Sequence, residues 1–164
     1  MSEIVDVYDI NGNKLNKTIE RNQDKLNPGE YRMGSLAFIT DKKDNFLIQQ
    51  RAFTKKILPG KWAITGGAAL SGEDKTQCVV REINEELGIK ITPKNLKFLM
   101  LYIEETGDVL VNIFVAYINR KTKITRQTNE VEQIKWVSRQ ELLKLHKSGD
   151  FIQPRLDELL SKIR

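Results

Sequence analysis

The segment GAALSGEDKTQCVVREINEELGI, residues 67–89, decides the fold and indicates the chemistry. It places three carboxylates, Glu82, Glu85 and Glu86, close together on one short stretch. Like charges three or four residues apart on a helix repel by a few tenths of a kcal/mol per pair, so helix propensity alone does not favour this crowding. The segment therefore predicts a positive partner at this place.

A helix is predicted over residues 73–87, ended by Gly88 in the left-handed conformation that closes helices. At about 100° per residue, its apolar face is expected to consist of Thr76, Val80, Ile83 and Leu87, with Val79 at the margin. The adjacent stripe carries Cys78 and the three carboxylates. Crowded acids either raise their pKa values or bind a cation, and hard divalent cations prefer oxygen ligands. The alternative is a solvated acidic face paired with nearby lysines.

Residues 67–89 match every fixed position of the pattern G-x5-E-x7-R-E-U-x-E-E-x-G-U, where U is a bulky aliphatic residue. This pattern is the Nudix box, and the chain resembles the Nudix hydrolases. The resemblance continues more loosely through FLIQQRA, LPGKWAITGG and WVSRQEL. It implies the Nudix fold, an α/β/α sandwich of the α+β class with a mixed β-sheet between helices.

The resemblance also implies roles for individual residues. The metal ligands for Mg²⁺ or Mn²⁺ would be Glu82, Glu85 and Glu86, joined by the carbonyl of Gly66. Arg81 would orient a metal-binding glutamate, and Glu73 would hold the loop of the box. Glu82, Glu85, Glu86 and Arg81 are accordingly the candidate catalytic residues.

The reaction implied is hydrolysis of a diphosphate linkage in a nucleoside diphosphate joined to a group X. The substrate would be a nucleoside di- or triphosphate, or a nucleotide-linked alcohol or sugar. Divalent cations neutralise phosphate oxygens and generate hydroxide from bound water. The general base stays open between a box glutamate and four acids outside the box: Glu104, Glu105, Glu130 and Glu132.

Other residues near the box are weighed individually. Arg51 ends a predicted strand and Lys61 precedes the box, so both are candidate substrate-binding residues, with a structural ion pair as the alternative for Arg51. Trp62 is expected to pack in the core. Cys78 is expected to be a small buried filler rather than a nucleophile, and the lone His146 falls on a different predicted helix.

Three alternative functions are considered. A silent binding or regulatory module would usually lose box acids, and all are present. The segment NPGEYRMGSLAF resembles the isopentenyl diphosphate isomerase branch of the fold, but that branch needs a cysteine where this chain has AITGG, and its acids after the box are replaced by VLVNIFVAY. An RNA 5′-end pyrophosphohydrolase would show a dense basic groove. The chain is therefore interpreted as isomerase-like in sequence and a hydrolase in chemistry.

Composition sets the remaining expectations. A chain of 164 residues fits one domain, residues 1–164, with residues 1–30 as an N-terminal extension of short strands. The net charge of +5 is spread along the chain, which indicates a solvated basic surface rather than a nucleic-acid site, and a small anionic substrate suits the balance equally well. One cysteine, a polar N-terminus and the lack of a long apolar run predict a cytoplasmic protein with no membrane span. Many Nudix relatives pair as homodimers, and the oligomeric state is left open.

Elements outside the box follow from alternation and turn signals. A hairpin is predicted around Asn11-Gly12, and residues 18–26 are predicted to be a short helix or loop. Ser138 is predicted to cap a helix beginning RQELLKL. Strands are predicted at 4–8, 32–40, 46–51, 62–65, 96–103, 109–117 and 134–137, and a closing helix within 150–164.

Overall fold

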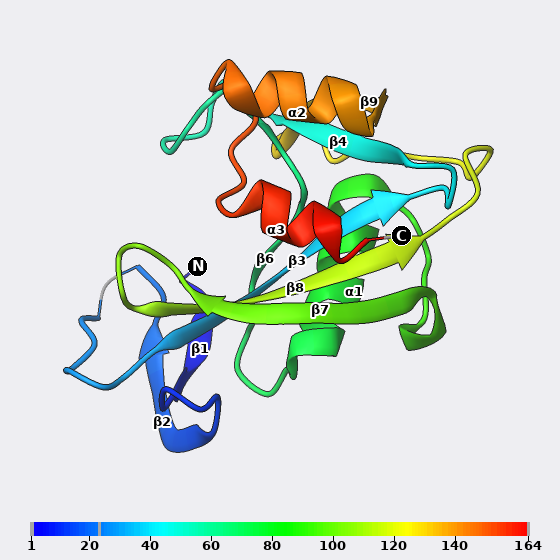
Figure 1. Cartoon of the computed structure of the whole chain (residues 1–164). Coiled ribbons are helices and arrows are strands. Elements are labelled where there is room, and N and C mark those ends of the chain that lie inside the picture. The colour runs from blue at the N-terminus through cyan, green and yellow to red at the C-terminus, as the bar shows by residue number, and fades with distance from the viewer. Residues whose placement is uncertain (1, 23, 164) are drawn as a thin grey trace.

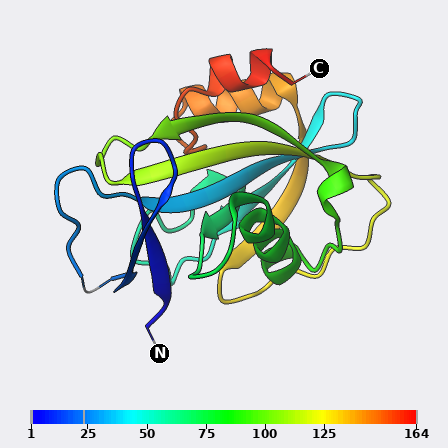
Figure 2. The ribbon, with the colours of Figure 1, turned by 90° about the horizontal axis from the view of Figure 1, so that it is seen from below.

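A mixed β-sheet lies between helices in the computed structural model, which describes residues 2–22 and 24–163 (Figure 1). Helix α1 (Lys75–Leu87) covers one face of the sheet, and helices α2 (Arg139–Lys147) and α3 (Leu156–Ser161) cover the other. Figure 2 shows this arrangement from the side, with α2 and α3 above the sheet and α1 below it. The predicted α+β class and layer order are confirmed.

The sheet contains seven strands in the order β5-β4-β3-β8-β7, with β6 paired to β3 and β9 paired to β4. Strands β3 and β8 are parallel and the other pairs are antiparallel. A 3₁₀ turn, η1 (Pro93–Asn95), precedes β7. The strand bounds are β3 (Arg32–Thr40), β4 (Asn45–Arg51), β5 (Trp62–Ala63), β6 (Thr65–Ala68), β7 (Leu96–Ile103), β8 (Val109–Tyr117) and β9 (Val131–Ser138).

Two hydrophobic cores follow from the alternation of side chains along the strands. On β4, Phe46 and Ile48 belong to the core under α2 and α3, whereas Leu47 belongs to the core under α1. Trp62 lies in the first of these cores at 9% exposure, as predicted. The face of β4 that carries Leu47 is therefore the face that meets the helix of the box.

The N-terminal strands β1 (Ile4–Tyr8) and β2 (Lys14–Glu20) form a separate two-stranded antiparallel sheet. The predicted hairpin is confirmed. The prediction of a helix or loop from residue 18 onward is wrong for residues 18–20, because they pair with residues 4–6 of β1. Their polar sequence did not indicate a strand, and the partner strand decides it.

Several predicted element bounds shift, and the strand predicted at 62–65 is two strands, β5 and β6. Three of the shifts have a clear local reason. Helix α1 begins at Lys75 because Asp74 is its N-cap and accepts from the amides of Thr76 and Gln77. Strand β9 begins at Val131 rather than at residue 134, since its first residue pairs with Arg51. The closing helix begins only at Leu156, because residues 150–152 run extended beside Trp62 before Pro154.

The N-terminal hairpin packs on the loop of the box through a partly buried acid. Asp6 accepts hydrogen bonds from the Gly72 amide and the Ser71 hydroxyl, both at 2.9 Å, and pairs with Lys14 at 3.0 Å. The Ser71 amide donates to the Ile4 carbonyl at 2.9 Å. These bonds hold the pKa of Asp6 below its usual value, against the opposing effect of burial. Residues far apart in sequence thus meet at the loop that carries Glu73.

Replacing Asp6 by Ala should lower the free energy of unfolding by about 1–3 kcal/mol, because it leaves an amide, a hydroxyl and an ammonium without their shared acceptor. Urea denaturation measures this change. Asp157→Ala is the matched control, since Asp157 is exposed on α3 and such surface changes cost within about 0.5 kcal/mol. Equal losses in the two variants would contradict the role of Asp6 as an anchor.

No helix within the described part of the chain combines the length and apolar character needed to span a membrane.

Candidate active site

Helix α1 presents a different face to the core from the predicted one. Cys78, Val79, Ile83 and Leu87 are all 0% exposed, whereas Thr76 and Val80 are half-buried. The buried face is therefore rotated toward the stripe of acids. As a result Glu86 enters the core at 8% exposure, which the helical wheel did not predict.

Arg81 lies at the centre of the acidic cluster. Its Nε and Nη2 donate to the two carboxylate oxygens of Glu73 at 2.6 and 3.0 Å, and Nη2 also donates to the Ala68 carbonyl at 3.0 Å. Its Nη1 donates to Glu82 at 2.8 Å and to Glu85 at 3.1 Å. A planar guanidinium can hold several oxygens in this way, whereas an ammonium cannot. Arg81 thus links the loop of the box to two of its acids.

Glu73 completes the link because it lies before the helix rather than within it. One of its oxygens accepts from the Leu70 amide at 2.9 Å. Its pKa is lowered by Arg81 and the Leu70 amide, although burial acts in the opposite direction. Glu73 is therefore ionised, and its hydrogen bonds hold the loop over residues 70–73 in place.

Glu82 lies against the backbone of the box. A Cβ atom on Gly67 would come within 2.5 Å of a Glu82 carboxylate oxygen, so the glycine leaves room for the Glu82 side chain in this position. The side chain of Glu82 is 14% exposed. Burial raises its pKa, while the charge of Arg81 and the hydrogen bond from it act to lower the pKa.

Glu86 is the most buried of the three acids. It accepts a hydrogen bond from the Gln49 side-chain amide at 2.9 Å, and no salt bridge to it occurs among the described residues. Burial raises its pKa to about 8, with further contributions from the charges of Glu82 and Glu130; the Gln49 amide and the Gly66 backbone oppose the shift. Glu86 is thus a desolvated carboxyl without a cationic partner.

Glu85 differs from both neighbours because its side chain is 53% exposed and contacts Arg81. The three acids of the stripe therefore occupy three environments. Glu82 is buried against backbone, Glu86 is buried against a neutral amide, and Glu85 is open to solvent.

These acids fit a hard divalent cation by their chemistry, although they are not grouped around a common point. No three His, Cys, Asp or Glu side chains of residues 2–22 and 24–163 are close enough together to hold a metal as they lie. Arg81 holds Glu82 and Glu85, and Gln49 holds one oxygen of Glu86. Carboxylates are the ligands that Mg²⁺ and Mn²⁺ take, and the uncompensated Glu86 is a site where a cation would offset desolvation. The acids would have to change their side-chain conformations to converge on one cation.

Gly66 lies on β6 beside Glu86. Strand β6 pairs with β3, and a Cβ atom on Gly66 would come within 2.1 Å of the Ser35 carbonyl oxygen. Only glycine is compatible with this approach of two strands. The predicted role of its carbonyl as a metal ligand stays a prediction.

The two predicted substrate-binding residues are both engaged with backbone. Arg51 donates from Nε to the Ile57 carbonyl at 3.0 Å, rather than making the predicted alternative of an ion pair. Lys61 donates to the Gly149 carbonyl at 3.0 Å and lies 3.6 Å from Asp150. The contacts of Lys61 thus lie at the loop after α2 rather than at the acids of the box. Substrate binding by either residue stays a prediction.

Among the four acids outside the box, Glu130 is the one that the structure relates to Glu86. Its charge contributes to the raised pKa of Glu86, and its own carboxylate pairs with Lys55. Backbone bonds bring this segment to the end of α1, since the Gln127 amide donates to the Glu86 carbonyl at 2.8 Å. Glu104 and Glu105 are exposed in the turn between β7 and β8, and Glu132 is half-buried on β9.

Cys78 and His146 lie apart from one another in the fold, on α1 and α2 respectively. The thiol of Cys78 is fully buried and contacts the Gly67 carbonyl at 3.5 Å. Burial raises its pKa to about 12, which leaves it uncharged near neutral pH. Cys78 is a buried packing residue, as predicted.

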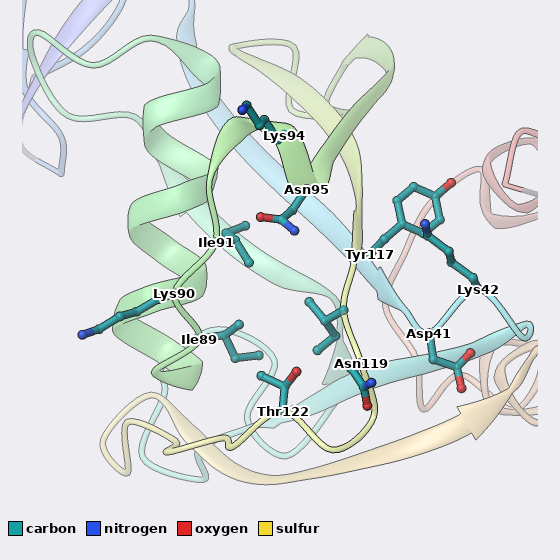
Figure 3. A pocket seen from close by; sticks show the side chains of 11 residues that line it. Asp41, Lys42, Ile89, Lys90, Ile91, Lys94, Asn95, Tyr117, Asn119 and Thr122 are labelled. Atoms are coloured by element: carbon teal, nitrogen blue, oxygen red, sulfur yellow. The ribbon is translucent and has the colours of Figure 1, made fainter.

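A pocket of about 510 Å³ lies beyond the C-terminal end of α1 (Figure 3). The residues that line it include Ile89, Ile91 and Ile118, together with Tyr117 and Lys42, which lie at one side in Figure 3. Lys90 points away from the other lining side chains (Figure 3). None of the box acids lines this pocket, so it is separate from the candidate site.

Two buried polar residues of the site were not predicted. Gln49 is 5% exposed and Thr65 is 1% exposed, and the Thr65 hydroxyl donates to the Gln49 amide oxygen at 3.2 Å. The signal that was available is the position of Gln49 in FLIQQR, where alternation from Leu47 calls for a core residue.

The NUDIX domain family matches residues 30–159 of the chain. An uncharacterized Nudix hydrolase of Listeria innocua is 33% identical over 150 residues, which cover 90% of this chain and 86% of that protein. An isopentenyl-diphosphate Delta-isomerase of Dinoroseobacter shibae is 34% identical over 102 residues, or 58% of each chain.

A solved structure supports the fold. The crystal structure of DR0079 from Deinococcus radiodurans superposes with a TM-score of 0.79 at 19% identity and covers 99% of this chain and 100% of that one. Its coverage includes the N-terminal hairpin, which lies outside the family match.

Proposed function

Because this chain belongs to the Nudix family and is a hydrolase of acid anhydrides, we propose that it hydrolyses the diphosphate linkage of a nucleoside diphosphate-X substrate with Mg²⁺ or Mn²⁺. The observation that carries this proposal is the arrangement of the box acids on α1. Glu82 and Glu86 are desolvated, and Glu86 has no cationic partner in the described structure. A bound cation would supply the missing positive charge.

The resemblance to the Nudix family and the contacts of the side chains support the following roles. Glu82, Glu85 and Glu86 would hold the cation, with the Gly66 carbonyl beside them. When bound, a divalent cation neutralises phosphate oxygens and lowers the pKa of a coordinated water. Arg81 keeps Glu82 and Glu85 in place, and Glu73 keeps Arg81 in place. Among the acids outside the box, Glu130 is kept as the candidate for a base because it lies near enough for its charge to act on Glu86, although it is paired with Lys55.

The substrate is proposed as a nucleotide on two grounds. The resemblance implies it, and a net charge of +5 suits an anionic ligand. The similarity to an isopentenyl-diphosphate isomerase makes an isoprenoid diphosphate the second candidate. Against isomerisation, the segment before the box reads AITGG and offers no cysteine.

A coupled phosphate-release assay tests the proposal. Nucleoside di- and triphosphates, dinucleotides, sugar nucleotides and isopentenyl diphosphate are supplied with Mg²⁺, with Mn²⁺, or with chelator. We expect turnover of one nucleotide class that chelator abolishes. Isomerisation of isopentenyl diphosphate without phosphate release would favour the second candidate, and metal-independent turnover would contradict the assigned roles of the acids.

Light scattering decides between a monomer of 18.9 kDa and a homodimer.

A further inference from the structure

Gln49 is a polar residue where the fold calls for an apolar one. It follows Leu47 on the face of β4 that meets α1, and Leu47 packs there in a core with Val79 and Ile83. Gln49 itself is 5% exposed. Burying an amide costs free energy unless its polar atoms are hydrogen-bonded. A buried amide at this position therefore needs hydrogen-bond partners at both ends, and those partners indicate what it does.

Both ends of the Gln49 side chain are bonded, and in a defined direction. Its Nε2 donates to Glu86 at 2.9 Å, and its Oε1 accepts from the Thr65 hydroxyl at 3.2 Å. When Glu86 binds a cation it is ionised, and an ionised carboxylate only accepts hydrogen bonds, so the amide nitrogen then faces Glu86. The opposite orientation of the amide would place two acceptors against each other. Thr65, Gln49 and Glu86 thus form a directed series of buried hydrogen bonds.

This hydrogen-bond series constrains one oxygen of the Glu86 carboxylate, and a backbone hydrogen bond from Gly66 also acts on that carboxylate. Gln49 bonds Oε2 of the carboxylate. The main chain of Glu86 is held separately, since its carbonyl accepts from the Gln127 amide at 2.8 Å. The donor is neutral, so it orients the acid without supplying the positive charge that a metal would bring. An arginine or lysine in its place would compete with the cation.

We propose that Gln49 is a positioning residue that orients Glu86 for the divalent cation, and that Thr65 in turn orients Gln49. The inference rests on the proposed function, in which Glu86 is a metal ligand. Partners of this kind fix the direction of a ligand's lone pairs, and their loss typically weakens metal binding by about 10- to 100-fold.

Metal binding by the protein alone tests this role without substrate. Mn²⁺ is titrated into wild type and Gln49→Met, which keeps the length of the side chain and removes its donor. We expect the dissociation constant to rise by about 10- to 100-fold in Gln49→Met. The matched control is Gln50→Met, because Gln50 is the next residue on β4 and donates instead to the Gly60 carbonyl. Its Mn²⁺ affinity should equal that of wild type.

Two variants of Thr65 keep the test decisive if Gln49→Met does not fold. Thr65→Val removes the hydroxyl and should weaken Mn²⁺ binding, whereas Thr65→Ser retains the donor and should restore it. A merely structural role would lower the melting temperature in Gln49→Met and leave Mn²⁺ affinity unchanged, which would overturn the inference. Equal losses in Gln49→Met and Gln50→Met would also overturn it. Failure of wild type to bind Mn²⁺ would instead overturn the proposed function, and the inference with it.

Discussion

Replacing Glu86 by Gln should abolish turnover and yet stabilise the metal-free protein at alkaline pH. Loss of a carboxylate ligand removes several kcal/mol of the stabilisation that a bound cation supplies to the transition state. A loss of about 4 kcal/mol corresponds to about a thousandfold in rate. The same substitution removes a buried charge without a cationic partner, so stability and activity should change in opposite directions.

The pH dependence follows from the direction of the pKa shift. Glu86 has a reference pKa of 4.5 and a pKa of about 8 in the folded protein. Between these values the folded state binds more protons than the unfolded state, so the free energy of unfolding falls as pH rises. Below pH 4.5 the carboxyl is protonated in both states and no penalty applies. Above pH 8 the full penalty is present.

Thermal unfolding of chelated protein at pH 5 and pH 9 measures this effect. Glu86→Gln should melt at least about 5 °C above wild type at pH 9, since 1 kcal/mol corresponds to about 2–4 °C for a chain of this size. The difference should shrink toward pH 5. Glu85→Gln is the control for stability, because Glu85 is 53% exposed and its loss removes only a solvent-screened contact to Arg81. Equal stabilisation by both variants would contradict the conclusion that Glu86 is the acid whose buried charge destabilises the protein.

Replacing Arg81 by Lys should reduce both turnover and stability. Lysine keeps the charge but cannot reproduce a fork that bonds Glu73 through two nitrogens while also holding Glu82. Full removal of the guanidinium, as in Arg81→Ala, leaves partly buried carboxylates without a partner. Such a loss costs about 3–5 kcal/mol of stability in the extreme case. For Arg81→Lys we expect a tenfold to hundredfold loss of kcat, within the range of about 10- to 100-fold seen for partners of metal ligands.

Steady-state kinetics across a range of Mg²⁺ concentrations checks this prediction. A positioning role requires the apparent metal affinity to fall together with kcat. Arg155→Lys is the matched control, because Arg155 pairs with Glu158 on the surface of α3, where such pairs contribute little. If excess metal restored Arg81→Lys to full kcat and stability, Arg81 would serve only to raise metal affinity.

Sequence alone indicated the layers, most of the strands and the location of the candidate site. Nine fixed positions within residues 67–89 identify the family, and apolar runs bounded by turn signals identify β3, β4, β7 and β8 almost to the residue. Gly88 as the end of α1 and Ser138 as the cap of α2 were also readable, because a helix end depends on the residues beside it. These features are local, since their period or turn chemistry is contained within a few residues.

Tertiary structure alone decided how the acids differ. On a helical wheel Glu82, Glu85 and Glu86 share one stripe, but burial against β3, β4 and β6 makes Glu86 a desolvated carboxyl and leaves Glu85 in solvent. The partner of Glu86, Gln49, lies 37 residues away in sequence, and the anchor of the box loop, Asp6, lies 66 residues from Gly72. A pKa depends on which groups surround a side chain in space. Spacing along the chain reports neighbours on the same element, whereas these environments are created only when the sheet and the helix pack together.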